Sequence, residues 1–467
     1  MSRVLLINPD YFEDIFASSK MRAAISRGTI PLGLACLAAP LIQGGHDVNI
    51  LNLNLADKRT DVLMETLKNL RPQFVGVTAT TPLIYKAYGI AEKIKDFDER
   101  IIVIAGGPHP SALPEEVLTG SLIDCVVKGE GDLALKELVE NGPNSSIPNL
   151  YYKENGAIVQ SQIQNQHIKD LDCLPFPAYE LFDVKNYYQP GIASRKKPLG
   201  YLETSRGCYG KCIFCNKNIH GFKTRMKSPG RVVDEMERML SLGFREIHII
   251  DDIFTADMKR AYAICEEILR RNLDFPWYPR GGIRVDRVSP ELLRIMKKAG
   301  CYRIPFGIES GSQRILDIAK KKITIEQAET AVKMAKSADM ETECYFMIGL
   351  PNETEEEIKK SLALAIKLNP DYVKFAITVP LPGTPMFAEM EKNGQIKTRD
   401  WEKYNFSISP RELYNHDTLS WEVINKYYNQ AHRKFYFRIS YVLRMIGHTL
   451  RNGTFFSHIK AFMQTKW

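Results

Sequence analysis

The chain has 467 residues, of which 44% are hydrophobic and 25% are charged, an ordinary composition for a soluble globular protein. This length exceeds what one hydrophobic core usually organises, so it favours two or three domains. The apolar run at the N-terminus ends at Asn8 and Pro9, too early for a secretory signal. No stretch of the sequence approaches the about eighteen apolar residues that a membrane span needs, and we therefore expect a cytoplasmic protein.

The formal net charge of +8 is concentrated at the C-terminus. Residues 423–467 contain eight Lys or Arg and no Asp or Glu. This segment accounts for the whole excess, and the rest of the chain is balanced. We expect no nucleic-acid partner, because a basic tail beside a balanced core is a weak indication of one.

Through residues 1–140, short β-branched or apolar runs alternate with helical patterns. This alternation is typical of an α/β domain with a doubly wound, Rossmann-like parallel sheet. Such a sheet binds ligands beyond the carboxyl ends of its strands. These ends are rich in glycine, proline and small polar residues, as close approach to a large ligand requires. The predicted strands are 3–8, 48–54, 74–80, 101–107 and 124–129.

A second βα series follows a loosely patterned segment. Residues 141–193 are rich in Asn, Gly, Gln and Pro, which indicates a linker or a small subdomain. Residues 194–400 predict a partial (β/α)6 barrel, whose chemistry lies at the carboxyl ends of its strands. Residues 401–467 read as a basic, aromatic, helical extension. The six predicted barrel strands are 199–206, 246–252, 277–286, 302–310, 341–350 and 372–381.

Nine cysteines in a reducing compartment indicate metal binding wherever they cluster. Cys208, Cys212 and Cys215 stand at CxxxCxxC spacing in a loop after the first barrel strand. Iron–sulfur clusters usually take four thiolates, so three leave one iron open for another ligand. The alternative is a tetrahedral Cys3His zinc site that includes His220. The other cysteines are interpreted as packing residues: Cys36, Cys125, Cys173, Cys265, Cys301 and Cys344.

The cysteine motif and four strand ends resemble the radical S-adenosylmethionine (SAM) superfamily. The resemblance implies a 4Fe-4S cluster on the three cysteines, with SAM at the open iron. Structural interpretations of these residues stay open. Asp251 and Asp252 could cap a helix, and Glu309 and Ser310 could form a turn. Arg284 could form a barrel salt bridge rather than a carboxylate clamp. The SAM-binding residues that the resemblance implies are Phe214, Asp251, Asp252, Arg284, Glu309, Ser310 and Gly349.

The strand ends of residues 1–140, including Gly106-Gly-Pro-His-Pro and Gly129-Glu-Gly-Asp, resemble the cobalamin-binding domain that precedes many radical SAM cores. His46 and His109 do not fit the DxHxxG motif that ligates cobalt in other cobalamin domains. The resemblance therefore implies cobalamin held without a lower protein histidine. The residues expected to contact the corrin are Thr78, Thr80, Gly106, Gly107 and Gly129.

The resemblance implies a cobalamin-dependent radical SAM enzyme, most often a methyltransferase that acts on an unactivated carbon. In that scheme SAM supplies the radical that abstracts a substrate hydrogen, and methylcobalamin delivers the methyl group. The alternatives are a cyclase or rearrangement enzyme with the same cofactors and no net methylation, and a non-catalytic iron–sulfur electron-transfer protein. A methylthiotransferase is disfavoured because residues 1–190 lack a second cysteine triad. The sequence identifies no further catalytic residue.

The expected partners are a small-molecule substrate and a flavodoxin- or ferredoxin-type reductant. Basic residues among aromatics in the tail suit a helix that lies on an anionic membrane surface, which makes a lipid, isoprenoid or tetrapyrrole an attractive substrate. The alternative for the tail is an aromatic helix packed over the barrel mouth with its arginines in solvent.

Overall fold

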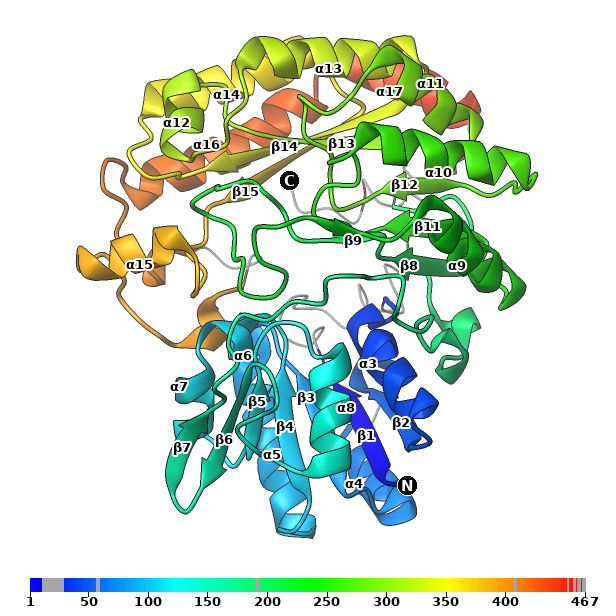
Figure 1. The fold of residues 1–467 in the computed structure, drawn as a ribbon. Coiled ribbons are helices and arrows are strands. Elements are labelled where there is room, and N and C mark those ends of the chain that lie inside the picture. The colour runs from blue at the N-terminus through cyan, green and yellow to red at the C-terminus, as the bar shows by residue number, and fades with distance from the viewer. Residues whose placement is uncertain are drawn as a thin grey trace.

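The computed structural model describes residues 1–10, 29–55, 59–189, 193–405, 410–451, 453–456, 459 and 463. A sheet-based domain formed by the N-terminal residues lies against a partial barrel formed by the central residues (Figure 1). The predicted α/β fold class is therefore confirmed.

The first sheet has seven strands in the order β2-β1-β3-β4-β5-β6-β7. Its first five strands are parallel. The inner strands β1, β3, β4 and β5 are largely buried, which explains their apolar sequences, whereas the edge strand β2 is mostly half-buried. Helices α3 (Leu32–Gln43) and α8 (Asp132–Asn141) cover one face. Helices α4 (Arg59–Leu70) and α5 (Ile84–Phe97) cover the other. The parallel strands are β1 (Arg3–Asn8), β2 (Asp47–Asn52), β3 (Phe74–Thr78), β4 (Ile102–Gly106) and β5 (Cys125–Val127).

The segment expected as a linker contributes to this sheet. Strands β6 (Leu150–Glu154) and β7 (Ala157–Gln160) form an antiparallel hairpin, and β6 pairs with β5. The residues between them, Asn155 and Gly156, have φ values of 51° and 79°. Positive φ at both positions is typical of the two-residue turn that Asn-Gly favours.

The barrel consists of two three-stranded parallel sheets, β12-β11-β8 and β13-β14-β15. Two isolated parallel bridges, Trp277 to Cys301 and Ile283 to Phe306, join them. The six strands thus form one curved surface in sequence order, open between its first and last strands. They are β8 (Leu199–Leu202), β11 (Glu246–Ile249), β12 (Trp277–Pro279), β13 (Arg303–Glu309), β14 (Glu341–Ile348) and β15 (Tyr372–Ile377).

The barrel helices begin where the sequence supplies capping residues. Ser228 and Ser289 each accept a backbone hydrogen bond at a helix start that is followed by proline. Thr324 and Thr354 form capping boxes with Gln327 and Glu357. The helices are α9 (Pro229–Ser241), α10 (Met258–Arg270), α11 (Pro290–Lys298), α12 (Gln313–Ile318), α13 (Ile325–Ser337), α14 (Glu355–Leu368) and α15 (Pro385–Lys392).

The C-terminal helices α16 (Trp421–Tyr436) and α17 (Ile439–Arg451) pack on the far side of the barrel from the first domain (Figure 1). Tyr441 donates to the carbonyl of Asp371, and Arg444 donates to that of Pro370, just before β15 begins. Helix α17 therefore covers the amino ends of the strands, so the interpretation as a helix over the barrel mouth with solvated arginines is wrong.

No helix in the described part of the chain is long and apolar enough to cross a membrane. Two lysines of the extension, Lys460 and Lys466, lie outside the described residues.

Candidate functional site

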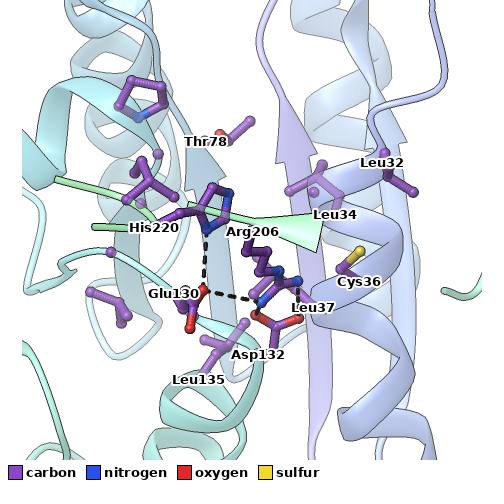
Figure 2. A pocket seen from close by; sticks show the side chains of 18 of the residues that line it. Leu32, Leu34, Cys36, Leu37, Thr78, Glu130, Asp132, Leu135, Arg206 and His220 are labelled. Atoms are coloured by element: carbon purple, nitrogen blue, oxygen red, sulfur yellow. Dashed lines mark hydrogen bonds and ion pairs between the residues drawn. The ribbon is translucent and has the colours of Figure 1, made fainter. Parts of the chain in front are cut away.

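A cavity of about 500 Å³ separates the first sheet from the barrel. The carboxyl ends of β1, β3, β4 and β5 form one side, and the loop that carries the cysteines forms the other (Figure 2). Of the five residues expected to contact a corrin, four line this cavity: Thr78, Gly106, Gly107 and Gly129. Thr80 instead precedes the short 3-10 helix η2 (Thr81–Leu83).

The backbone at the cavity requires glycine at two positions. Gly107 has a φ of 99°, and a Cβ atom there would lie 2.8 Å from Oγ1 of Thr78. Gly129 has a φ of 79°, and a Cβ atom there would lie 3.3 Å from the carbonyl oxygens of Asn218 and Ile219 in the cysteine loop. Glycine therefore lets both the cavity wall and the second domain approach closely.

The two histidines of this domain lie away from the cavity. His46 accepts a hydrogen bond from the Ser2 amide at the amino end of the sheet. His109 is fully buried and packs edge-on against Trp401, with ring centroids 5.2 Å apart. Burial lowers the pKa of His109 to about 4, so it is neutral at pH 7. These positions agree with a domain that offers no histidine to a ligand in the cavity.

A buried ionic cluster joins the two domains beside the cavity (Figure 2). Asp132 accepts two hydrogen bonds from Arg206, at 2.8 and 3.0 Å, and Glu130 accepts two from Arg225, at 2.8 and 2.7 Å. Burial raises the pKa of Glu130, but hydrogen bonds from His220 and Arg225 lower it to about 2 overall. Sequence analysis named these acids only within a segment that resembles a corrin-binding domain, and it indicated none of their partners.

His220 belongs to this cluster and not to the cysteine triad. Its Nδ1 atom lies 3.2 Å from Glu130, and its Nε2 atom lies 3.6 Å from Glu203. Among the described residues, no three His, Cys, Asp or Glu side chains gather where a single metal ion could bind. This arrangement disfavours a Cys3His zinc site, in which all four ligands would bind one metal ion. In an iron–sulfur cluster, by contrast, each thiolate binds a different iron.

The cysteine loop connects β9 (Ser205–Arg206) to β10 (Arg225–Met226). A Cβ atom on Gly210 would lie 3.2 Å from the sulfur of Cys208 and 3.9 Å from that of Cys212, so glycine leaves room between the thiols. A hydrogen bond from the Cys215 thiol lowers the pKa of Cys212. The loop thus places the Cys208 and Cys212 sulfurs around Gly210 and brings the Cys215 thiol within hydrogen-bonding reach of Cys212. A thiolate is the form that binds iron.

Phe214 packs against a small apolar cluster formed by Ile315, Ala319 and Leu350. Leu350 directly follows Gly349 in the chain, and Met347 packs against the same cluster. The structure therefore brings Phe214 and the Gly349 segment together, as expected if both bound the same ligand.

A charged pair lies beneath the cysteine loop at the end of β13. Nζ of Lys321 donates to Glu309 across 2.8 Å, and both side chains are buried. Burial opposes the charge of Lys321, but Glu309 and the thiol of Cys212 raise its pKa overall. Glu309 has a φ of 73°, a strained conformation that concentrates at functional sites. Sequence analysis named Glu309 but missed Lys321, which lies within a run of three lysines.

The remaining SAM candidates divide between the cavity and the protein interior. Asp252 is exposed and lines the cavity. Asp251 is buried, and its carboxylate accepts hydrogen bonds from Thr204 and Ser205. Asp251 therefore connects β11 to the start of the cysteine loop.

Two further candidates have partners within the protein. The Arg284 guanidinium pairs with Asp286 at 2.9 Å and donates to two carbonyls of the loop that follows α12. This contact agrees with the barrel salt bridge considered for it. Ser310 is fully buried, and its hydroxyl lies 3.3 Å from that of Ser361.

A family model described as the radical SAM superfamily matches residues 202–365, and a B12 binding domain model matches residues 20–139. An uncharacterised methyltransferase of Pyrococcus horikoshii is 35% identical over 451 residues, covering 95% of this chain and 94% of the relative. The anaerobic magnesium-protoporphyrin IX monomethyl ester cyclase of Rubrivivax gelatinosus is 30% identical, covering 86% of this chain and 72% of the relative. The chain belongs to the radical SAM superfamily and carries an N-terminal B12-binding domain.

Solved structures show the same architecture. The radical SAM methyltransferase TsrM of Kitasatospora setae, with cobalamin and a [4Fe-4S] cluster bound, aligns with a TM-score of 0.70 at 22% identity, covering 85% of this chain and 76% of TsrM. The cobalamin-dependent radical SAM enzyme OxsB aligns with a TM-score of 0.75 at 17% identity, covering 99% and 71%. The expected cofactors, a 4Fe-4S cluster, SAM and cobalamin, are thereby confirmed as those of the family.

Proposed function

We propose that this chain is a cobalamin-dependent radical SAM methyltransferase that acts on an unactivated carbon. The observation that carries the proposal is the cavity between the glycine-lined strand ends and the cysteine loop. A ligand in it would contact both domains. When bound, the cofactors supply radical and methyl-transfer chemistry.

The chain's own residues would bind and orient the cofactors. Cys208, Cys212 and Cys215 would hold the cluster. Asp252, Phe214 and Glu309 would contact SAM, and Asp251 and Ser310 would act through the segments that they fix. Gly349 and Arg284 would shape the backbone around SAM. The cavity glycines and Thr78 would face the corrin, with Thr80 at its edge.

The test is anaerobic reconstitution with iron, sulfide and cobalamin, followed by SAM and dithionite. The wild type should retain iron, sulfide and cobalt and form 5'-deoxyadenosine and methionine. Cys212→Ala should lose iron and product. Cys173→Ala, at an exposed cysteine outside the site, should behave as the wild type. A wild-type protein that binds iron without forming 5'-deoxyadenosine would indicate an electron-transfer protein instead.

A cyclase or rearrangement enzyme is the second candidate, favoured by the 30% identity to the Rubrivivax cyclase. Product mass separates the two functions. A substrate that gains one methylene unit supports methylation, whereas conversion without that gain supports the cyclase.

For the reductant we propose an acidic flavodoxin or ferredoxin. A second cavity, of about 1030 Å³, reaches Cys212 and Cys215 from the protein surface. No Asp or Glu is found among its described lining residues, which include four lysines: Lys128, Lys211, Lys217 and Lys320. Complementary charge would steer an acidic partner to the cluster.

Charge reversal tests this assignment. Lys211→Glu should slow reduction by flavodoxin but not by dithionite, and Lys298→Glu on α11 should change neither rate. Equal flavodoxin rates in all three proteins would contradict the proposed docking site.

A hydrophobic substrate, such as a lipid, an isoprenoid or a tetrapyrrole, and contact with a membrane surface are also proposed. Helix α17 exposes apolar side chains at helical spacing: Ile439, Val442, Leu443, Ile446 and Leu450. Such a stripe suits an interfacial helix. Wild-type protein should float with anionic liposomes, whereas Leu443→Glu should remain unbound, and wild-type protein that remains unbound would contradict membrane contact.

A further inference from the structure

An arginine without a carboxylate partner lies in the barrel interior. Arg280 follows β12, and its guanidinium carbon lies 5.8 Å from the ring centroid of Tyr201. Its Nη1 atom is buried and has no hydrogen-bond partner among the described residues. A buried guanidinium nitrogen without a hydrogen-bond partner is costly, so this nitrogen is suited to a ligand.

A break in the third barrel strand directs Arg280 inward. The expected strand 277–286 ends at Pro279, and the amide of Arg280 bonds back to the carbonyl of Tyr278. The next residue, Gly281, has no room for a side chain, since a Cβ atom would lie 2.0 Å from the carbonyl oxygen of Asp251. Irregularities of this kind re-aim side chains beside functional sites.

The interior acids near Arg280 already have other hydrogen-bonding or ionic partners. Glu343 pairs with Lys374 at 2.8 Å, and Glu341 pairs with Arg303 at 2.9 Å. Glu246 lies 2.6 Å from His248 and accepts two backbone amides. Two of these acids are therefore neutralised by other cations, and none of the three forms an ion pair with Arg280 among the described residues.

The surroundings of Arg280 are aromatic, and Arg280 itself is half-buried. Tyr201 and Tyr278 form the buried side, and the half-buried Tyr345 lies on β14. The amide of Gly281 donates to the carbonyl of Ile249, and the next residue, Ile250, is 39% exposed and lines the cavity. Arg280 is therefore close in the chain to a cavity-lining segment, and an anionic group with an apolar body could reach its half-buried guanidinium.

We infer that Arg280 binds an anionic group, a carboxylate or a phosphate, of the substrate. The substrate's apolar body would pack on the tyrosines, and its reacting carbon would point toward the cofactor cavity. This inference rests on the proposed function and narrows its substrate to an amphipathic anion.

The test uses the probe 3-(4-fluorophenyl)propanoate, its neutral amide, and the full-length reconstituted protein, with binding followed by fluorine NMR. The wild type should bind the acid and not the amide. Arg280→Gln should weaken acid binding by about 10- to 100-fold, the range for a lost hydrogen bond to a charged group, and Arg280→Lys should restore part of it. Arg294→Gln, on the exposed face of α11, is the matched control and should bind as the wild type.

A wild type that does not bind the acid, or equal acid binding by Arg280→Gln, would overturn the inference. SAM affinity is measured in parallel. If Arg280→Gln weakens SAM binding by the same factor, the anion is the SAM carboxylate and the substrate assignment is wrong. Formation of 5'-deoxyadenosine by the wild type is a separate readout: its absence contradicts the proposed function, whereas the probe still tests Arg280.

Discussion

The contact between Lys321 and Glu309 is the strongest charge pair beneath the cysteine loop, because both groups are buried and only 2.8 Å apart. Each would be an uncompensated buried charge without the other. Lys321 is also close enough to Cys212 to lower the pKa of that thiol. One ammonium thus neutralises a carboxylate and favours a cluster thiolate.

Lys321→Met should lower the free energy of unfolding by about 3 kcal/mol or more, the cost of removing one partner from a buried pair. The iron content after reconstitution should fall as well, because Cys212 loses a nearby positive charge. Chemical denaturation and iron analysis measure the two effects. Lys322→Met, at the exposed neighbouring lysine, should change neither quantity, and a stable Lys321→Met protein would show that the pair contributes little.

His109 is a second single residue with a testable effect, because its titration makes the free energy of unfolding depend on pH. Its pKa is lowered to about 4 by burial, against about 6.5 in an unfolded chain. The unfolded state therefore binds the proton first, so stability is lost as the pH falls from about 6.5 toward 4. Between pH 7 and pH 5 this group alone should remove about 2 kcal/mol.

His109→Asn should lose about 2 kcal/mol less than the wild type between pH 7 and pH 5 in urea unfolding. The variant is expected to be less stable at pH 7, because it lacks the contact with Trp401. The comparison therefore rests on the slope with pH, and parallel slopes would mean that His109 titrates normally.

At the scale of elements, the turn between β5 and α8 fastens the first domain to the cysteine loop. Glu130 in this turn accepts hydrogen bonds from Arg225 and from the backbone amide of Ile168. Its pKa of about 2 means that its contribution to stability is present above about pH 4.5 and is lost as the pH falls toward 2. The contact is therefore intact at neutral pH.

Glu130→Gln keeps the shape of this side chain and removes its charge, which leaves the positive charge of Arg225 without its carboxylate partner. We expect faster hydrogen exchange in residues 216–225 and a loss of about 3 kcal/mol in the free energy of unfolding. Glu137→Gln, on the helix α8 that follows this turn, is the control. Unchanged exchange in the cysteine loop would contradict a role for Glu130 in holding it.

Elements with strong local signals were predictable from the sequence. The strands 3–8 and 74–80 were found because short apolar runs are followed by Asn or Pro, and the barrel was found because such runs alternate regularly with helical patterns. The β6–β7 hairpin was missed because its second strand is largely exposed and has little apolar pattern. The Asn155-Gly156 dipeptide was the signal that could have revealed it.

The sequence suggested candidate ligands for the site but not the residues that hold those candidates in place. Three cysteines at close spacing predict a metal site without any tertiary information. The engagement of Asp251 by Thr204 and Ser205, or of His220 by Glu130, depends on which loops meet in space. Arg280 escaped notice because its open guanidinium becomes evident only once the neighbouring acids are seen to be paired.

At the scale of the whole molecule, both domains contribute residues to the walls of the cavity. A ligand that fills it would contact both and should stabilise the folded protein by mass action, about 2.7 kcal/mol at a free concentration 100 times its Kd. Binding of cobalamin is therefore expected to raise the stability of the whole protein.

Gly106 permits a specific test, because it lines this cavity and a Cβ atom there would meet nothing closer than the Val127 carbonyl oxygen, at 3.8 Å. Gly106→Leu should therefore fold, fill the corrin side of the cavity and abolish cobalt retention and cobalamin-dependent stabilisation. Iron content should remain at the wild-type level, since the cysteine loop is formed by the other domain. Gly89→Ala on α5, where a Cβ atom meets nothing within 4 Å, should retain both metals. Normal cobalt retention by Gly106→Leu would place the corrin elsewhere, and simultaneous loss of iron and cobalt would show that the two sites assemble only together.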